Sequence, residues 1–175
     1  MAYIYDLPFG RGQHFNIDNP VLNAVAGGWQ LNGVTTVQTG LPFTPQLGTS
    51  SANTGDPRPN RYSNGNLPSD QRSVSHWFDT AAFLPTPTPY LFGNAGRNII
   101  FAPGAVNFDF SAFKRFPVKQ IGEAGEVQFR AEFFNIMNHP ELAQPSPRVD
   151  VPVGGTISSL VTPMRTVQLG LKVIF

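Results

Sequence analysis

The sequence ends in the stretch Arg165-Thr166-Val167-Gln168-Leu169-Gly170-Leu171-Lys172-Val173-Ile174-Phe175. Apolar residues alternate with polar residues or glycine through it, and only Ile174 departs from the pattern; the apolar set is Val167, Leu169, Leu171, Val173 and Phe175. A period of two predicts a β-strand with one apolar face, because successive side chains of a strand point to opposite sides. At roughly 3.3 Å per residue the stretch is about 35 Å long, and a tilted strand of about 9–11 residues crosses a bilayer. We therefore predict a membrane-spanning strand at 165–175.

Four further stretches carry strand patterns, so the chain is predicted to have about five strands. Their ranges are 2–6, 28–40, 105–116 and 126–137. In 28–40, Trp29 stands at the start of the strand, where an interfacial ring of aromatic side chains is expected in a membrane barrel.

The connections between these strands alternate in length. Two of them, 41–104 and 141–164, are long, rich in proline and glycine, and without sustained periodicity, whereas 117–125 is short. Outer-membrane barrels alternate short periplasmic turns with longer extracellular loops. We therefore predict an all-β fold: the C-terminal part of an antiparallel transmembrane β-barrel in the cell outer membrane, with Phe175 at the periplasmic rim and two long extracellular loops. Within the first loop we expect a short helical turn at 74–83, capped by Ser73 or Ser75.

The composition agrees with a membrane barrel better than with a soluble domain. Charged residues make up 13% of the chain, against roughly 25% in typical soluble domains. The net charge is +1 with scattered lysines and arginines, so we expect no nucleic-acid partner. The start, Met1 to Asp6, has neither the basic nor the apolar region of a signal peptide, and we expect the chain to be a fragment of a longer protein.

No group of residues has the spacing of a catalytic or metal site. His14, His76 and His139 are far apart in the sequence, without the spacings His-x-x-x-His or Glu-x-x-His. The chain has no cysteine and no Gly-x-Ser-x-Gly motif. We expect no metal, no cofactor and no enzymatic activity.

Four charged residues lie on the polar sides of three predicted strands: Asp109, Arg130, Glu132 and Lys172. Exposing Arg or Lys to lipid near the middle of a bilayer costs about 2–4 kcal/mol, so we predict that all four face the lumen. We expect Arg130 to bond to Asp109 or Glu132 in a polar network whose role is structural.

The first long loop contains aromatic residues that could contact a ligand, with Trp77, Phe78 and Tyr90 as the candidates. The alternative, which we favour, is that the loop aromatics pack within the loop or against other parts of the barrel.

Several short blocks, in this order and spacing, resemble the C-terminal part of TonB-dependent outer-membrane receptors of the Oar-like group. The blocks are Gly28-Trp29-Gln30-Leu31-Asn32-Gly33, Gln38-Thr39-Gly40-Leu41-Pro42-Phe43, Arg58-Pro59-Asn60, Trp77-Phe78-Asp79-Thr80-Ala81-Ala82-Phe83, Phe92-Gly93-Asn94-Ala95-Gly96-Arg97-Asn98, Asn107-Phe108-Asp109-Phe110-Ser111, Phe129-Arg130-Ala131-Glu132-Phe133-Phe134-Asn135 and Asn138-His139-Pro140. Together with the terminal strand they extend over nearly the whole chain.

The resemblance implies a receptor that takes up a ligand through a 22-stranded barrel filled by an N-terminal plug. Its implied partners are outer-membrane lipid, the rest of the barrel, the plug, and TonB through an N-terminal part that this chain lacks. The terminal alternation resembles the signal that the barrel-assembly machinery recognises.

Two alternatives remain open. A soluble carbohydrate-binding β-domain would need a second apolar layer over Val127, Phe129, Ala131 and Phe133, and no segment is a candidate for it. The anchor of another outer-membrane barrel, such as a porin or an adhesin, has the same strand periodicity.

Overall fold

The structure, a computed structural model, describes residues 1–49, 55, 57–88, 90–118 and 125–175. Its contacts divide the chain into two compact units. Unit 1 consists of 1–37, 106–140 and 162–175, and unit 2 of 38–105 and 141–161.

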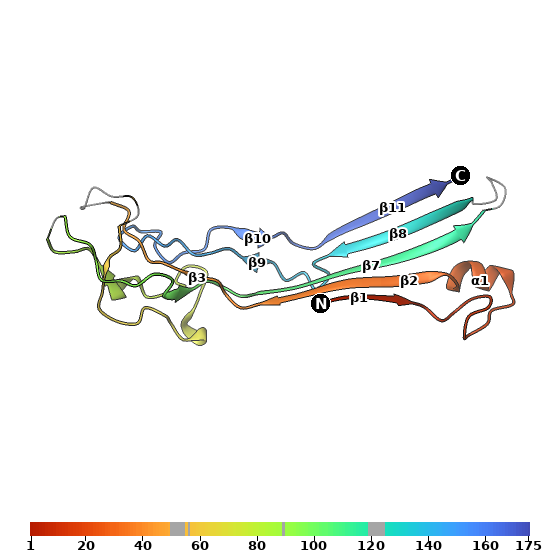
Figure 1. The fold of residues 1–175 in the computed structure, drawn as a ribbon, viewed down its shortest axis with the longest axis horizontal. Helices are drawn as coiled ribbons and strands as arrows, with labels where there is room; N and C mark the ends of the chain where they lie inside the picture. Colours follow the sequence, from red (N-terminus) through yellow and green to blue (C-terminus); the bar gives the residue numbers. More distant parts are fainter. Residues whose placement is uncertain (50–54, 56, 89, 119–124) are drawn as a thin grey trace. The chain divides into compact units, whose positions relative to one another are not determined.

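Unit 1 is built on a five-stranded sheet with the order β1-β2-β7-β8-β11 (Figure 1). The ladders of β1 with β2, β7 with β8, and β8 with β11 are antiparallel. The strands are β1 Ala2–Asp6, β2 Trp29–Gln38, β7 Ala105–Pro117, β8 Glu126–Phe134 and β11 Thr166–Ile174. The prediction of an antiparallel all-β fold is confirmed.

The register gives this sheet two different faces. Glu132 lies opposite Ser111 on β7 and opposite Gln168 on β11. The next residue of β8, Phe133, lies opposite Phe110 and Val167. Because directly opposite residues project to the same side of a sheet and successive residues to opposite sides, one face collects polar side chains and the other collects apolar ones.

The strand predicted at 126–137 ends earlier, at Phe134. Asn135 has φ 51°, in the left-handed region, and turns the chain away from the ladder. Asparagine tolerates this region better than most residues, because its short polar side chain bonds locally. The sequence analysis placed the end of this strand at residue 137, and was wrong by three residues.

A helix that the sequence analysis missed interrupts the connection between β1 and β2. It is α1, Pro20–Ala26. Asn19 caps it, because its Oδ1 accepts hydrogen bonds from the backbone N–H groups of Val21 and Leu22 at 2.9 and 3.2 Å. Pro20 occupies the first turn, where its missing N–H costs nothing.

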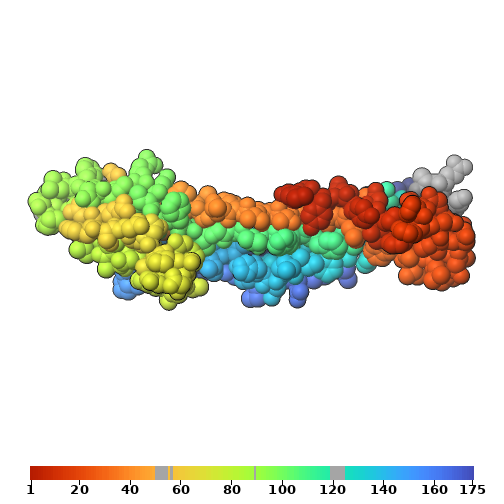
Figure 2. Space-filling view, turned by 90° about the horizontal axis from the view of Figure 1, so that it is seen from below, coloured from red at the N-terminus to blue at the C-terminus, as the bar shows by residue number. Residues whose placement is uncertain are grey.

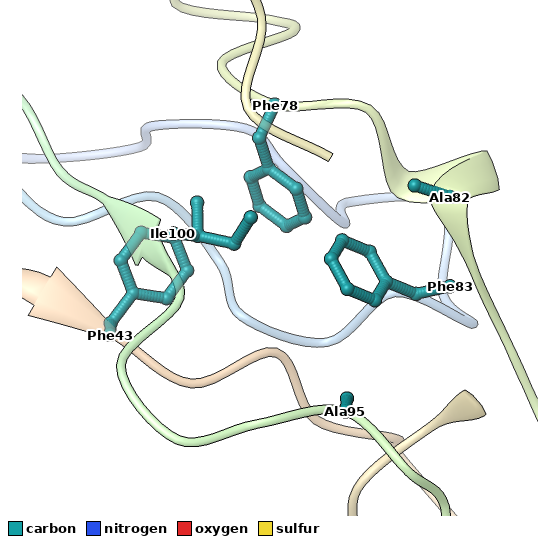
Figure 3. Close-up of a cluster of buried hydrophobic side chains, with 6 residues drawn as sticks. All are labelled: Phe43, Phe78, Ala82, Phe83, Ala95 and Ile100. Atoms are coloured by element: carbon teal, nitrogen blue, oxygen red, sulfur yellow. The ribbon is translucent and has the colours of Figure 1, made fainter. Parts of the chain in front are cut away.

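Unit 2 contains short strand pairs and its own core. Phe43, Phe78, Ala82, Phe83, Ala95 and Ile100 form a buried cluster (Figure 3). The elements are β3 Pro42–Phe43 with β6 Ile100–Phe101, β4 Asn60–Arg61 with β5 Phe83–Leu84, β9 Glu141–Leu142 with β10 Leu160–Thr162, and two 3-10 turns, η1 Ser69–Gln71 and η2 Thr80–Ala82. The segment 41–104, predicted as a loop, therefore supplies a core, and Val149 of the second long segment packs against it.

The helical turn predicted at 74–83 is shorter than expected. It is η2, and its cap is Asp79, whose Oδ1 accepts from the N–H of Ala81 at 3.0 Å. Neither Ser73 nor Ser75 caps it; their hydroxyls lie 3.2 Å from each other.

The two segments of unit 2 are joined by backbone hydrogen bonds. Gln46 donates to Pro147 O at 2.8 Å and accepts from the N–H of Val149 at 2.9 Å. Trp77 N–H donates to Gly155 O at 2.9 Å. Residues about a hundred positions apart therefore belong to one hydrogen-bonded structure.

Candidate functional site

The candidate site is the polar face of the sheet in unit 1. Arg130 lies opposite Phe113 and Gly170, and Lys172 lies opposite Gln128. Asp109 is two residues from Ser111, the partner of Glu132, and so shares the same side. The register therefore brings Asp109, Arg130, Glu132 and Lys172 to one face, as expected from the sequence.

The polar face continues onto β1 and β2. Gln30 Nε2 donates to Asp6 Oδ1 at 2.8 Å, and the two residues are opposite each other in the ladder. A cleft of about 350 Å³ joins these residues to Phe113 and Arg115. Hydrogen-bonding side chains thus extend from one edge strand of the sheet to the other.

Arg130 does not make the bond that the sequence analysis predicted. Its Nε and Nη2 donate to Gln128 Oε1 at 3.1 and 2.8 Å, and its guanidinium lies 5.2 Å from the centre of the Phe113 ring. Asp109 is four residues from Phe113, or about 13 Å along the strand, and is out of reach. Gln128 is the next residue on the same face of β8 and supplies the acceptor.

Asp109 instead supports the turn after β8. Its Oδ1 accepts from Asn107 Nδ2 at 3.0 Å and from the backbone N–H of Asn135 at 2.9 Å. Asn135, 1% exposed, donates through Nδ2 to Pro163 O and accepts from the N–H of His139. One buried asparagine therefore ties the end of β8 to the segment that leads into β11.

The opposite face of the sheet is apolar and open. Val167, Leu169, Leu171 and Val173 all lie on it, and Leu169 is 67% exposed. Their ladder partners on β8 are Phe133, Ala131, Phe129 and Val127. Phe175 follows the strand at 93% exposure. The residues predicted as an assembly signal form a continuous apolar row.

Lys114 is an exception that the sequence analysis missed. It lies opposite Phe129, on the apolar face, yet only 3% of it is exposed. Its Nζ donates to Val25 O at 2.9 Å and to Gly27 O, and it lies over the rings of Trp29 and Phe116. The sequence indicates the face on which Lys114 lies, because Lys114 is separated by an even number of residues from Phe110, Ala112 and Phe116 and therefore projects to the same side of the strand as they do.

The three loop aromatics have different environments. Phe78 is 1% exposed and belongs to the core of unit 2, so it packs within the loop, the alternative favoured from the sequence, and its side chain is closed to a ligand. Trp77 is half-buried, donating through Nε1 to Phe101 O at 2.8 Å with Arg72 over its ring. Tyr90 is 78% exposed, and of the three it has the side chain most open to a ligand.

The described part of the chain contains no group of three or more His, Asp or Glu side chains arranged to hold a metal ion. Within the described ranges, no helix has the length and apolar character needed to cross a membrane.

Comparison with protein families identifies a match that covers most of the chain. Residues 1–168 match the family model described as "Outer membrane beta barrel domain". No curated protein and no solved structure matches the chain.

Proposed function

This chain belongs to the outer membrane β-barrel domain family, and we propose that it forms part of the wall of a TonB-dependent, Oar-like receptor that takes up a ligand. The fold and the outer-membrane location follow from the family. The receptor class is supported by the ordered sequence blocks, from Gly28-Trp29-Gln30-Leu31-Asn32-Gly33 to Asn138-His139-Pro140. The proposed role is binding and transport, without catalysis.

The two-faced sheet is the observation that carries the proposal. In a barrel wall, lipid-facing and lumen-facing residues alternate along each strand. β11 has this alternation, with Leu169 and Leu171 on one side and Gln168 and Lys172 on the other. Apolar side chains on the lipid side need no further cover, because hydrocarbon is their solvent.

We assign the polar face to the lumen. Arg130 and Lys172 would each cost about 2–4 kcal/mol if they faced lipid near mid-membrane. In a hydrated lumen the Arg130 guanidinium keeps its bonds to Gln128 and its contact with Phe113. Asp109 and Glu132 complete the lumen-side group, which we propose to be structural.

Unit 2 is the proposed ligand-contacting part, because loops on the extracellular side of a barrel meet the ligand first. Tyr90 and the half-buried Trp77 are the candidate contacts. The remaining proposed partners are TonB, a plug, and the barrel-assembly machinery, which would recognise β11 and Phe175.

The soluble carbohydrate-binding alternative is not supported. It requires a second apolar layer over Val127, Phe129, Ala131 and Phe133, and none of the described elements of unit 1 forms one. A porin or the anchor of an adhesin would have the same barrel fold, so an experiment has to distinguish these two classes from a receptor.

Ion conductance separates a plugged receptor from an open porin. The protein expressed from its native gene would be purified from outer membranes and inserted into planar bilayers in KCl. A plugged lumen predicts no steady current until urea displaces the plug, whereas an open pore conducts at once. A steady open-pore current from the untreated protein would overturn the receptor proposal.

A second experiment tests coupling to TonB. Formaldehyde cross-linking in cells, followed by detection of a TonB adduct, is expected to capture the receptor. A strain without TonB is the control. A plugged barrel that never yields the adduct would contradict the energy-coupling part of the proposal while leaving the barrel assignment intact.

A further inference from the structure

The outer surface of α1 is apolar, although a short helix at the end of a sheet usually buries such residues. None of its residues is buried, and Val21, Leu22 and Val25 are 70%, 59% and 67% exposed. At 100° per residue, these three side chains cover an arc of about 100° on one side of the helix. The helix therefore presents a compact apolar stripe that no described residue covers.

The helix is nevertheless fixed firmly to the sheet. Trp29 Nε1 and Lys114 Nζ both donate to Val25 O, each at 2.9 Å, and Lys114 also donates to Gly27 O. A cation at the last carbonyls of a helix is favourable for its dipole. A helix of seven residues is too short to be stable alone, so these bonds hold it in place.

The attachment is on the lipid side of the sheet. Trp29 stacks edge-on against Phe129 at 6.4 Å, and Phe129 is the ladder partner of Leu171 on the apolar face. Lys114 projects from the same face. The bonds that hold α1 therefore come from the side of the sheet that meets hydrocarbon in the proposed barrel wall.

The helix also lies at the end of the sheet where β11 and the chain finish (Figure 1). The residues between β1 and β2 form a compact bulge at this end of unit 1 (Figure 2). The connection between β7 and β8 at this end is short, 118–125, and short turns of outer-membrane barrels are periplasmic. This places α1, beside the end of β7, at the inner leaflet, composed of phospholipid.

Charge near the helix fits a phospholipid surface. A cleft of about 340 Å³ between α1 and the end of β7 is lined by Arg11, Lys114 and Arg115. Lys114 is buried against the carbonyl groups of Val25 and Gly27. The exposed cations of this cleft are therefore Arg11 and Arg115, and Arg115 Nε lies 3.9 Å from Glu126 Oε1. Aromatic and basic side chains together, here Trp29 and Phe116 with Lys114, are typical of the level of the lipid headgroups.

We infer that α1 is an interfacial helix, with Val21, Leu22 and Val25 inserted at the boundary between the headgroups and acyl chains of inner-leaflet phospholipid and with Arg11, in the cleft beside it, facing the phosphates. The inference rests on the proposed function, because it requires the apolar face of the sheet to meet lipid. Its consequence is an anchor that fixes the height of the sheet in the membrane.

The test measures how deeply α1 is immersed. The chain contains no cysteine, so single cysteines can be introduced and labelled with a fluorescent maleimide. The positions are Val25→Cys on α1, Leu169→Cys on the apolar face, and Gln13→Cys, which lines the polar-face cleft with Asp6 and Gln30. The protein from its native gene, with any other cysteine replaced, is reconstituted in vesicles of phosphatidylethanolamine and phosphatidylglycerol that contain phosphatidylcholine brominated near the headgroup or deep in the chain.

The expected results differ at the three positions. The label at Val25 is quenched most by shallow bromine, the label at Leu169 by deep bromine, and the label at Gln13 by neither. Leu22→Cys, on the same stripe, repeats the measurement in case Val25→Cys perturbs folding. A variant is used only if its urea unfolding midpoint equals that of the protein without the substitution.

The outcomes separate this inference from the proposed function. If Leu169 is quenched and the labels on α1 are quenched no more than that at Gln13, the interfacial helix is disproved and the barrel wall stands. If Leu169 is not quenched, the apolar face does not contact lipid, and both fail.

Discussion

Lys114 Nζ lies 5.1 Å from the centre of the Trp29 ring, and both side chains donate to the same acceptor, Val25 O. A lysine on an apolar barrel face is expensive when it contacts hydrocarbon. Here the ammonium is covered by carbonyl groups and aromatic rings, so its charge never meets the lipid directly. This pair converts an unfavourable position into the attachment point of α1.

Replacing Lys114 with methionine tests the value of this attachment. Lys114→Met keeps the apolar stem but removes the donor to Gly27 O, and leaving a buried carbonyl unpaired costs about 1–3 kcal/mol. The free energy of unfolding, measured in urea by tryptophan fluorescence in vesicles, should fall by that amount. Lys172→Met, at an exposed position of the polar face, is the matched control and should change it by about 0.5 kcal/mol or less. Equal effects of the two variants would contradict the role given to Lys114.

Asn135 tests the turn that ends β8. Asn135→Gly keeps the positive φ but loses the bonds to Pro163 and His139, at a cost of about 1–3 kcal/mol. Asn135→Ala loses the same bonds and adds about 1–2 kcal/mol for a left-handed backbone. The alanine variant should therefore unfold at the lower urea concentration. Asn138→Gly, at a second residue with positive φ, is expected to have a smaller effect, because Asn138 is exposed and its side chain accepts a hydrogen bond from Arg165 N–H.

Two neighbouring residues of β11 test the assignment of the faces. Leu169→Arg puts a cation on the lipid side and should destabilise the barrel by about 2–4 kcal/mol, depending on depth. Gln168→Arg puts the same side chain in the lumen and should be tolerated. The amount of folded protein in the outer membrane and its unfolding free energy are the measurements. A barrel that tolerates Leu169→Arg and rejects Gln168→Arg would have its faces reversed.

The core of unit 2 has a direct test in Phe78. Truncating a fully buried phenylalanine costs about 3–5 kcal/mol, so Phe78→Ala should make unit 2 sensitive to protease added outside whole cells. Tyr90→Ala removes an aromatic ring of similar size from an exposed position and should leave the protease sensitivity unchanged. If Tyr90 contacts the ligand, its variant loses uptake while staying folded.

The strands were predictable because their information is local. Apolar and polar residues alternate along each stretch. The observed ends of β1, β7 and β11 lie within one residue of the predicted ends. The same periodicity places Arg130 and Lys172 on one face without any knowledge of their neighbours. What periodicity cannot supply is the choice of partner, which is why Gln128, rather than an acidic residue, bonds to Arg130.

The missed features depend on contacts between distant residues or on weak local signals. Asn19 and Pro20 are a helix start, but the seven residues of α1 are too few for a clear helical period. Phe43, Phe78 and Ile100 come from stretches without periodicity and meet only in the folded unit 2. Proline and glycine in this region shape its turns without preventing a core.

The bonds between the two segments of unit 2 have a consequence for loop exchange between receptors. Gln46 pairs with the backbone on both sides of Arg148, and Gly48 N–H donates to Asp150 Oδ1 at 2.6 Å. A chimaera that takes only residues 38–105 from another protein would leave these partners mismatched. The segments 38–105 and 141–161 therefore form one structural part. An experiment that transfers binding specificity between receptors has to exchange both segments together.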